Sequence, residues 1–209
     1  RRPPRSTLFP YTTLFRSQQY ISGGGYGYSL LMDRQSRVLA GGGHHRLREY
    51  PPSGGPSAYC ESVKHDQLRE HAVRLLHDLD WVGPAMVEFR RDPERNQFYF
   101  LEVNPRYWGS LPLFRFGGIN LPYLQFQAVQ GESDPDHRTE LPAGTKLKFT
   151  PLDLMAFFEN WVGWIHPIQL IGFAREQFDG SVHRGLWDSD DPMPFFRYLL
   201  SRMMSRGVG

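Results

Sequence analysis

Hydrophobic and polar positions recur with two different periods along this chain, and each period predicts one kind of element. From Asp66 to Leu79, apolar residues return every three or four positions between charged ones, which is typical of an amphipathic helix. Residues 85–91 (AMVEFRR) and 98–104 (FYFLEVN) are short runs rich in strand-forming residues on either side of DPERNQ. They predict two antiparallel strands joined as a hairpin.

The other stretches predict short strands before the first helix and mainly helices after the hairpin. Glycine triplets at Gly23–Gly25 and Gly41–Gly43 interrupt the strand-like segment that precedes the first helix. Further helices are expected over four ranges, 111–116, 121–130, 152–161 and 195–204. Because strands and helices are segregated along the chain, the predicted fold class is α+β, an antiparallel sheet with packed helices.

Composition narrows the class of protein. The chain has 209 residues, 40% of them hydrophobic, and one cysteine, Cys60. A lone cysteine excludes an internal disulfide framework and fits a reducing, cytoplasmic compartment. With no histidine that can be placed beside it, we expect Cys60 to be a buried structural thiol rather than a nucleophile. There is no run of eighteen apolar residues, so we expect no membrane span.

The first seventeen residues need separate treatment, because Thr7–Ser17 (TLFPYTTLFRS) is the conceptual translation of a common short-read sequencing adapter. We interpret residues 1–17 as an assembly artefact and expect the native sequence to begin inside a domain at Gln18. Without the four arginines of this segment, Lys+Arg falls from 24 to 20 against 22 Asp+Glu, and the net charge changes from +2 to −2. The charge then gives no support to nucleic-acid binding.

The predicted hairpin carries two acids that bear on chemistry. With its turn centred on Arg95, Glu88 falls opposite Glu102. Asn104 shares the face of Glu102, which we expect also to carry both phenylalanines of that strand. Like charges at ~5 Å repel by about 3 kcal/mol at an effective dielectric of ~20. A divalent cation removes this penalty, and two carboxylates with an amide oxygen form a hard ligand set suited to Mg²⁺ or Mn²⁺.

A simpler interpretation of the same acids stays open. Glu88 could pair with Arg90 or Arg106 on a solvent-facing side of the sheet. A slip of one residue in the turn would also separate the two glutamates. Spacing alone does not decide between these alternatives.

The stretch VEFRRDPERNQFYFLEVNPR resembles the metal-binding hairpin of the ATP-grasp superfamily, in which a first acid is followed one hairpin later by E-x-N-x-R. The resemblance implies that Glu88, Glu102 and Asn104 are the metal ligands. It also implies a catalytic role for Arg106, which would contact the substrate carboxylate or its acyl-phosphate. The flanking GPAMVEF and NPRYWGSLPL are similar to the branch that includes carbamoyl-phosphate synthase, biotin carboxylase and predicted ATP-dependent carboligases.

A second resemblance lies in QQYI, residues 18–21, which is similar to the adenine-binding hinge of the same superfamily. Backbone groups of Gln19 and Ile21 would meet the adenine edge, and Tyr20 would form part of the pocket wall. An ordinary strand end is the alternative. Many relatives carry an acid for the ribose hydroxyls a few residues later, where this chain has Gly23–Gly25, so it departs from the family pattern there.

Arg46 and Arg48 belong to the densely polar stretch HHRLRE. On a regular strand they point together, and arginine suits bidentate recognition of a phosphate or carboxylate. A solvated strand face is the alternative, and we favour it here.

The resemblance implies an ATP-dependent ligase with ATP and Mg²⁺ or Mn²⁺ as cofactors. ATP would activate a carboxylate as an acyl-phosphate, which an amine or another nucleophile then attacks. The partners are then small-molecule carboxylates and nucleophiles, with no nucleic acid and no membrane. A homo-oligomer is compatible with this interpretation. The competing hypothesis is a non-catalytic nucleotide-binding or interaction module derived from such an enzyme.

The resemblance also divides the chain. Residues 18–131 match the C-terminal part of an ATP-grasp domain, and residues 132–209 are expected to form a mainly helical appendage. In the family, phosphate-contacting lysines and a glycine-rich loop lie upstream of the hinge. We therefore expect this chain to be a fragment that is inactive alone.

Overall fold

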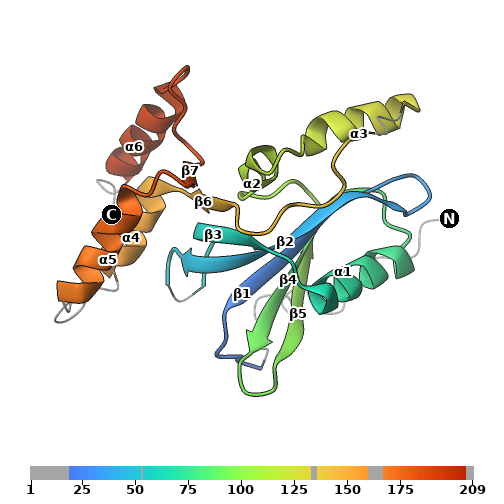
Figure 1. The fold of residues 1–209 in the computed structure, drawn as a ribbon, viewed down its shortest axis with the longest axis horizontal. Helices are drawn as coiled ribbons and strands as arrows, with labels where there is room; N and C mark the ends of the chain where they lie inside the picture. The colour runs from blue at the N-terminus through green and yellow to red at the C-terminus, as the bar shows by residue number, and fades with distance from the viewer. Residues whose placement is uncertain (1–18, 53, 133–135, 160–166, 206–209) are drawn as a thin grey trace, which may run out of the picture.

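A single seven-stranded sheet forms the centre of the computed structural model, which describes residues 19–52, 54–132, 136–159 and 167–205 (Figure 1). The strands follow the order β5-β4-β1-β2-β3-β6-β7, and all neighbours are antiparallel except β6 and β7. Their bounds are β1 Gly25–Met32, β2 Val38–Glu49, β3 Ser57–Val63, β4 Gly83–Asp92, β5 Gln97–Asn104, β6 Lys146–Lys148 and β7 Val182–Arg184.

Helices cover both faces of the sheet and gather beyond one of its edges. One face carries α1, and the other carries α2 and α3, while α4, α5 and α6 lie near β6 and β7 (Figure 1). The bounds are α1 Asp66–Asp78, α2 Pro112–Phe116, α3 Leu121–Gln130, α4 Thr150–Glu159, α5 Pro167–Gln177 and α6 Met193–Ser205. Across the described ranges, no helix combines the length and the hydrophobicity needed to cross a membrane.

The core under α1 follows from the two hydrophobic periods of the sequence. Leu68 and Leu76 of α1 are fully buried against Leu30 of β1 and Val87 of β4. Spacing of three to four residues on the helix and two on the strands brings these side chains to one interface. Each buried side chain of this size contributes about 2 kcal/mol relative to an exposed one.

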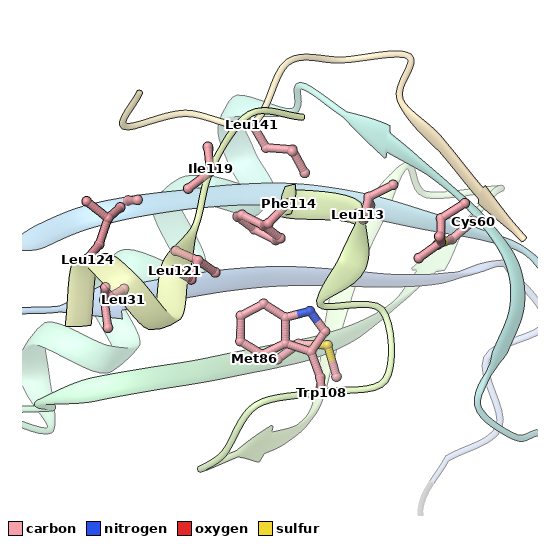
Figure 2. Close-up of a cluster of buried hydrophobic side chains, with 12 residues drawn as sticks. Leu31, Cys60, Met86, Trp108, Leu113, Phe114, Ile119, Leu121, Leu124 and Leu141 are labelled. Carbon is pink, nitrogen blue, oxygen red and sulfur yellow. The ribbon is translucent and has the colours of Figure 1, made fainter. Parts of the chain in front are cut away.

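The core on the opposite face fixes the chain just after β5. Trp108 lies beside Met86 of β4, and it meets Phe114 of α2 edge-on with ring centroids 5.6 Å apart (Figure 2). Cys60 is fully buried in the same cluster, and burial raises the pKa of its thiol to about 12. The expected burial of Cys60 is therefore confirmed, and the thiol stays protonated at neutral pH.

The predicted α+β class and most of the predicted elements are confirmed. The 66–79 helix, the hairpin and the 121–130 helix are present as α1, β4–β5 and α3, and the other three predicted helices are present with bounds shifted by one or two residues. The short strands β6 and β7 and helix α5 are additional to the prediction. Residues 160 and 161 of one predicted helix and the adapter-like segment lie outside the described residues.

The predicted division after residue 131 stays a prediction, and the sheet itself continues beyond that point. β6 pairs with β3, where Leu147 lies opposite Cys60. The connector before β6 is also hydrogen-bonded to the sheet, since the amide of Gly41 donates to Thr139 and that of Leu141 donates to Gly41.

A buried ionic cluster joins β2 to the C-terminal helices. Arg48 donates to Asp153 at 2.5 Å and to Glu176 at 2.6 Å, and Lys148 Nζ lies 3.5 Å from Asp153 Oδ2. Asp153 is fully buried and Lys148 is 2% exposed. Burial opposes the charge of Arg48, but hydrogen bonds to the two carboxylates raise its pKa overall. The cluster therefore ties α4 and α5 to the sheet through charged groups.

The pairing of β2 with β3 corrects both interpretations of Arg46 and Arg48. Arg46 faces Cys60 and Arg48 faces Tyr59, so Leu47 is an extra residue at a β-bulge. The bulge breaks the alternation that would point the two arginines together. Arg48 enters the buried ionic cluster instead of a solvated face or a shared phosphate site.

Candidate metal and nucleotide site

The β4–β5 hairpin brings Glu88 and Glu102 together through an irregular register. Near the turn Phe89 faces Phe100, one residue away from the predicted pairing. Between Phe89 and Glu88 the register shifts, so that Leu101 is an extra residue and Glu88 faces Glu102. The predicted pairing of the two acids is confirmed, although the turn is displaced from its predicted centre.

The same bulge shows that the expected face of the phenylalanines was wrong. Phe98 packs edge-on against Tyr26, with centroids 5.2 Å apart, in the cluster under α1. Glu102 and Asn104 lie on the other face, because Asn104 faces Met86 of the cluster around Trp108. The extra residue inverts the alternation of β5. The strand thus separates its aromatic side chains from its polar ones.

Hydrogen bonds connect all four residues of the E-x-N-x-R resemblance. The Asn104 amide donates to Glu88 Oε1 at 2.9 Å and to Glu102 Oε1 at 3.2 Å. Arg106 donates to Asn104 Oδ1 at 3.3 Å. One amide group therefore lies between two carboxylates that face each other across the hairpin.

Arg46 is a site residue that the sequence analysis did not connect with the acids. Its Nη2 lies 2.6 Å from Glu88 Oε2, and its Nη1 lies 3.3 Å from Glu49 Oε1. Glu49 in turn pairs with Arg90 at 3.2 Å. Arg90 was weighed as a partner for Glu88, but its described carboxylate partner is Glu49. Arg46 lies on β2, which β1 separates from β4, so spacing along the chain gives no signal for this pair.

A small cavity of about 120 Å³ opens beside these residues and is lined by Glu88, Asn104, Arg106, Arg46 and Trp108, among others. His44 also lines it, and burial together with the neighbouring Arg46 charge lowers the pKa of this imidazole to about 3. His44 is therefore neutral at physiological pH. Among the described residues, His44 Nδ1 and Trp108 Nε1 are buried without a hydrogen-bond partner.

His44 depends on a glycine on the neighbouring strand. Gly27 lies between His44 and Glu88 in the sheet, facing both. A Cβ at Gly27 would lie 2.3 Å from the ring of His44, so a larger residue there would displace the imidazole. Because Gly27 has no side chain, the imidazole of His44 can occupy this position at the cavity wall.

A second cavity, of about 360 Å³, adjoins the site, and its lining includes Arg46, Arg48, Arg90 and Glu49. The Arg48 guanidinium is bound in the ionic cluster, and Glu49 pairs with both Arg46 and Arg90. An anion that enters this space therefore competes with Glu49 for the guanidinium groups of Arg46 and Arg90.

The predicted hinge precedes β1, and a third cavity has none of the hairpin acids in its lining. Gln19 and Tyr20 are exposed, Tyr20 by 86%, and Ile21 is half-buried; all three precede β1. Their adenine-binding role stays a prediction. A larger cavity of about 430 Å³ lies between α2 and the segment from β7 to α6, and its lining includes none of Glu88, Glu102 and Asn104.

The donor set fits a hard divalent cation that shares its coordination with a phosphate. Glu88 and Glu102 offer carboxylate oxygens, and rotation of the Asn104 amide would turn its oxygen toward them. Within the described ranges there is no group of three or more His, Cys, Asp or Glu side chains placed to hold a metal. Mg²⁺ is commonly held by one or two carboxylates plus substrate phosphates.

Comparison with known families agrees with this geometry. Residues 46–149 match the family described as ATP-grasp in the biosynthetic pathway with Ter operon, a range that starts at Arg46 and includes Glu88, Glu102, Asn104 and Arg106. This part of the chain belongs to the ATP-grasp superfamily. The ATP-grasp region thus includes the described contacts of both acids.

Curated relatives and a solved structure point to the carboxylase-like branch. The chain is 31% identical over 77 residues to acetyl-CoA carboxylase of Schizosaccharomyces pombe, covering 36% of this chain and 3% of that protein. It is 36% identical over 86 residues to acetyl-CoA carboxylase 1 of Oryza sativa, covering 41% and 4%. The crystal structure of a Campylobacter jejuni biotin carboxylase complexed with β-γ-ATP superposes with a TM-score of 0.51 at 17% identity, covering 62% of this chain and 30% of that one. The ATP-grasp fold is shown, and the chain spans a small part of these relatives.

Proposed function

We propose that this chain supplies the metal-binding half of an ATP-dependent ligase that activates a carboxylate as an acyl-phosphate. The observation that carries the proposal is the pairing of Glu88 with Glu102 around the Asn104 amide. Two opposed acids around one amide offer hard oxygen ligands, and they suit a cation that bridges phosphate oxygens.

Each residue has a distinct part in this proposal. Glu88, Glu102 and Asn104 hold Mg²⁺, which offsets the charge that develops during phosphoryl transfer. Arg106 lies next to Asn104 and opens onto the 120 Å³ cavity, so it holds the substrate carboxylate or stabilises its acyl-phosphate. Arg46 lines the same cavity, where it pairs with Glu88.

The cavity limits what the carboxylate end of the substrate can be. A space of about 120 Å³ holds a carboxylate and a few further atoms. Because the pKa of His44 is lowered, its ring is neutral and can exchange a hydrogen bond without adding charge. The pocket suits a compact anionic group rather than a bulky apolar one.

The test is metal-dependent ADP formation from ATP with a panel of small carboxylates, measured on the complete ligase with and without the Glu102→Gln substitution in this chain. We expect Glu102→Gln to lose most of the activity with an unchanged fold, whereas Glu94→Gln in the exposed turn of the same hairpin should retain it. Unchanged turnover in Glu102→Gln would defeat the assignment of Glu102.

A non-catalytic nucleotide-binding module is the second candidate. It is favoured by Gly23–Gly25, which stand where many relatives carry an acid for the ribose. Binding of Mn²⁺ and ATP by the complete protein without ADP formation, for every carboxylate of the panel, would support this candidate.

A further inference from the structure

Arg46 stands between the two cavities of the site and is bound to one of the acids. It is the single residue in the described ranges that lines both the 120 Å³ and the 360 Å³ cavity. Its Nη2 is held by Glu88 at 2.6 Å and its Nη1 by Glu49 at 3.3 Å, while its buried Nε has no partner among the described residues. The Arg46 and Glu88 side chains are only 12% and 13% exposed.

The charges around Arg46 balance without a metal ion. The cluster contains three arginines and three glutamates: Arg46, Arg90, Arg106, Glu49, Glu88 and Glu102. A divalent cation added to this half-buried group leaves two uncompensated positive charges, which a low-dielectric environment penalises. Metal binding therefore needs either the departure of a guanidinium or the arrival of an anion.

We propose that Arg46 is an internal counter-ion that takes the place of the metal. It neutralises Glu88 while no divalent cation is bound, and it turns to the nucleotide phosphates when Glu88 becomes a metal ligand. This inference rests on the proposed function, because it takes Glu88 as a metal ligand.

The surroundings of Arg46 allow this exchange. Glu49 holds its Nη1 independently of Glu88, so the side chain keeps one anchor when the other is given up. The adjoining 360 Å³ cavity is lined by Gly24, Gly25, Glu49 and Arg90, among others, and Arg90 offers a second guanidinium beside Arg46 for an anion. A guanidinium binds phosphate oxygens through paired N–H groups, and the free Nε supplies one of them.

The consequence is that metal and nucleotide bind together. Without phosphates, Arg46 competes with the cation for Glu88 and repels it, so the affinity for the free cation is low. With phosphates present, the anion neutralises both the cation and the released guanidinium. The device prevents the acids from holding a metal when no nucleotide is there to use it.

The test is a titration of the chain with Mn²⁺ alone, in which electron paramagnetic resonance measures the concentration of free Mn²⁺. We expect Arg46→Gln to bind Mn²⁺ about tenfold more tightly than the wild type, because a competing positive charge is removed. Arg74→Gln, on exposed α1, is the matched control and should leave the affinity unchanged. Adding Glu88→Gln to Arg46→Gln should abolish the gain. Arg46→Met, which keeps an unbranched side chain, replaces Arg46→Gln if that variant does not fold.

Two outcomes overturn the inference: an Mn²⁺ affinity in Arg46→Gln that equals or falls below that of the wild type, or a gain that survives the loss of Glu88. Neither outcome contradicts the proposed function. That function fails by a different result, an affinity for Mn²⁺ with ATP that is unaffected by Glu102→Gln. The two failures are therefore separable in one set of titrations.

Discussion

Glu88 is the side chain on which the contacts of the site converge. It accepts from Asn104 and Arg46, faces Glu102 across the hairpin and lies on the same face of the sheet as His44. These neighbours come from two strands, β5 and β2. Sequence spacing could place Glu102 and Asn104 beside Glu88 because they lie in the same hairpin, but not Arg46 or His44. The contacts of Glu88 with β2 therefore depend on tertiary structure and could not be read from the sequence.

His44 gives a prediction about pH. Its pKa is about 3 in the folded chain against an ordinary value of 6.5, so the unfolded chain binds the proton more readily between these values. The free energy of unfolding therefore falls as the pH drops through this window, by about 1.5 kcal/mol between pH 6.5 and pH 5 for this group.

We expect His44→Gln to show a correspondingly shallower loss of stability on acidification in urea unfolding at several pH values. His77→Gln, at an exposed position of α1, should follow the wild-type slope. Parallel slopes for the wild type and His44→Gln would show that His44 titrates normally in the folded chain.

Bulges decide where the strands aim their side chains. Leu101 in β5 separates the phenylalanines from the acids, and Leu47 in β2 separates Arg46 from Arg48. Strand type and pairing partners were predictable from periodicity, but an extra residue inside a strand leaves no signal in a period-two pattern. The errors of face assignment in this chain both come from these two positions.

Deleting single residues of β5 tests the role of its bulge. Without Leu101, Glu102 follows Phe100 directly, and regular alternation still places Glu102 opposite Glu88 on the face away from Phe100. We expect this variant to retain Mn²⁺ binding in the presence of ATP. Deleting Val103 instead moves Asn104 to the face opposite Glu102 and should abolish binding. Loss of binding in both variants would show that the bulge itself is required.

The ionic cluster of β2, β6, α4 and α5 predicts a large effect from a single charge. Asp153→Asn leaves Arg48 and Lys148 buried with one carboxylate fewer, which should lower the free energy of unfolding by about 3 kcal/mol. Asp78→Asn, at the exposed end of α1, should change it by less than about 0.5 kcal/mol. Urea unfolding of both variants provides the comparison. Similar stabilities would mean that the cluster contributes little to holding the C-terminal helices.

Across the whole chain, long periodic segments were predictable from the sequence, and short segments were not. α1 and α3 follow from periodicity and turn residues. β6 and β7 have three residues each; β6 pairs with the edge of β3, and β7 pairs with β6. The acid pair was predictable because it lies within one hairpin. Its arginine partner, the ionic cluster and both cavities required the packing of elements distant in sequence.

The hairpin acids are proposed to hold a metal ion together with ATP. The most direct measurement is Mn²⁺ binding by electron paramagnetic resonance with and without ATP, for the wild type, Glu102→Gln and the exposed control Glu94→Gln. We predict that ATP strengthens Mn²⁺ binding in the wild type and in Glu94→Gln, and that Glu102→Gln loses at least about tenfold in affinity because a charged ligand is gone. Equal affinities in Glu102→Gln and Glu94→Gln would contradict the metal site.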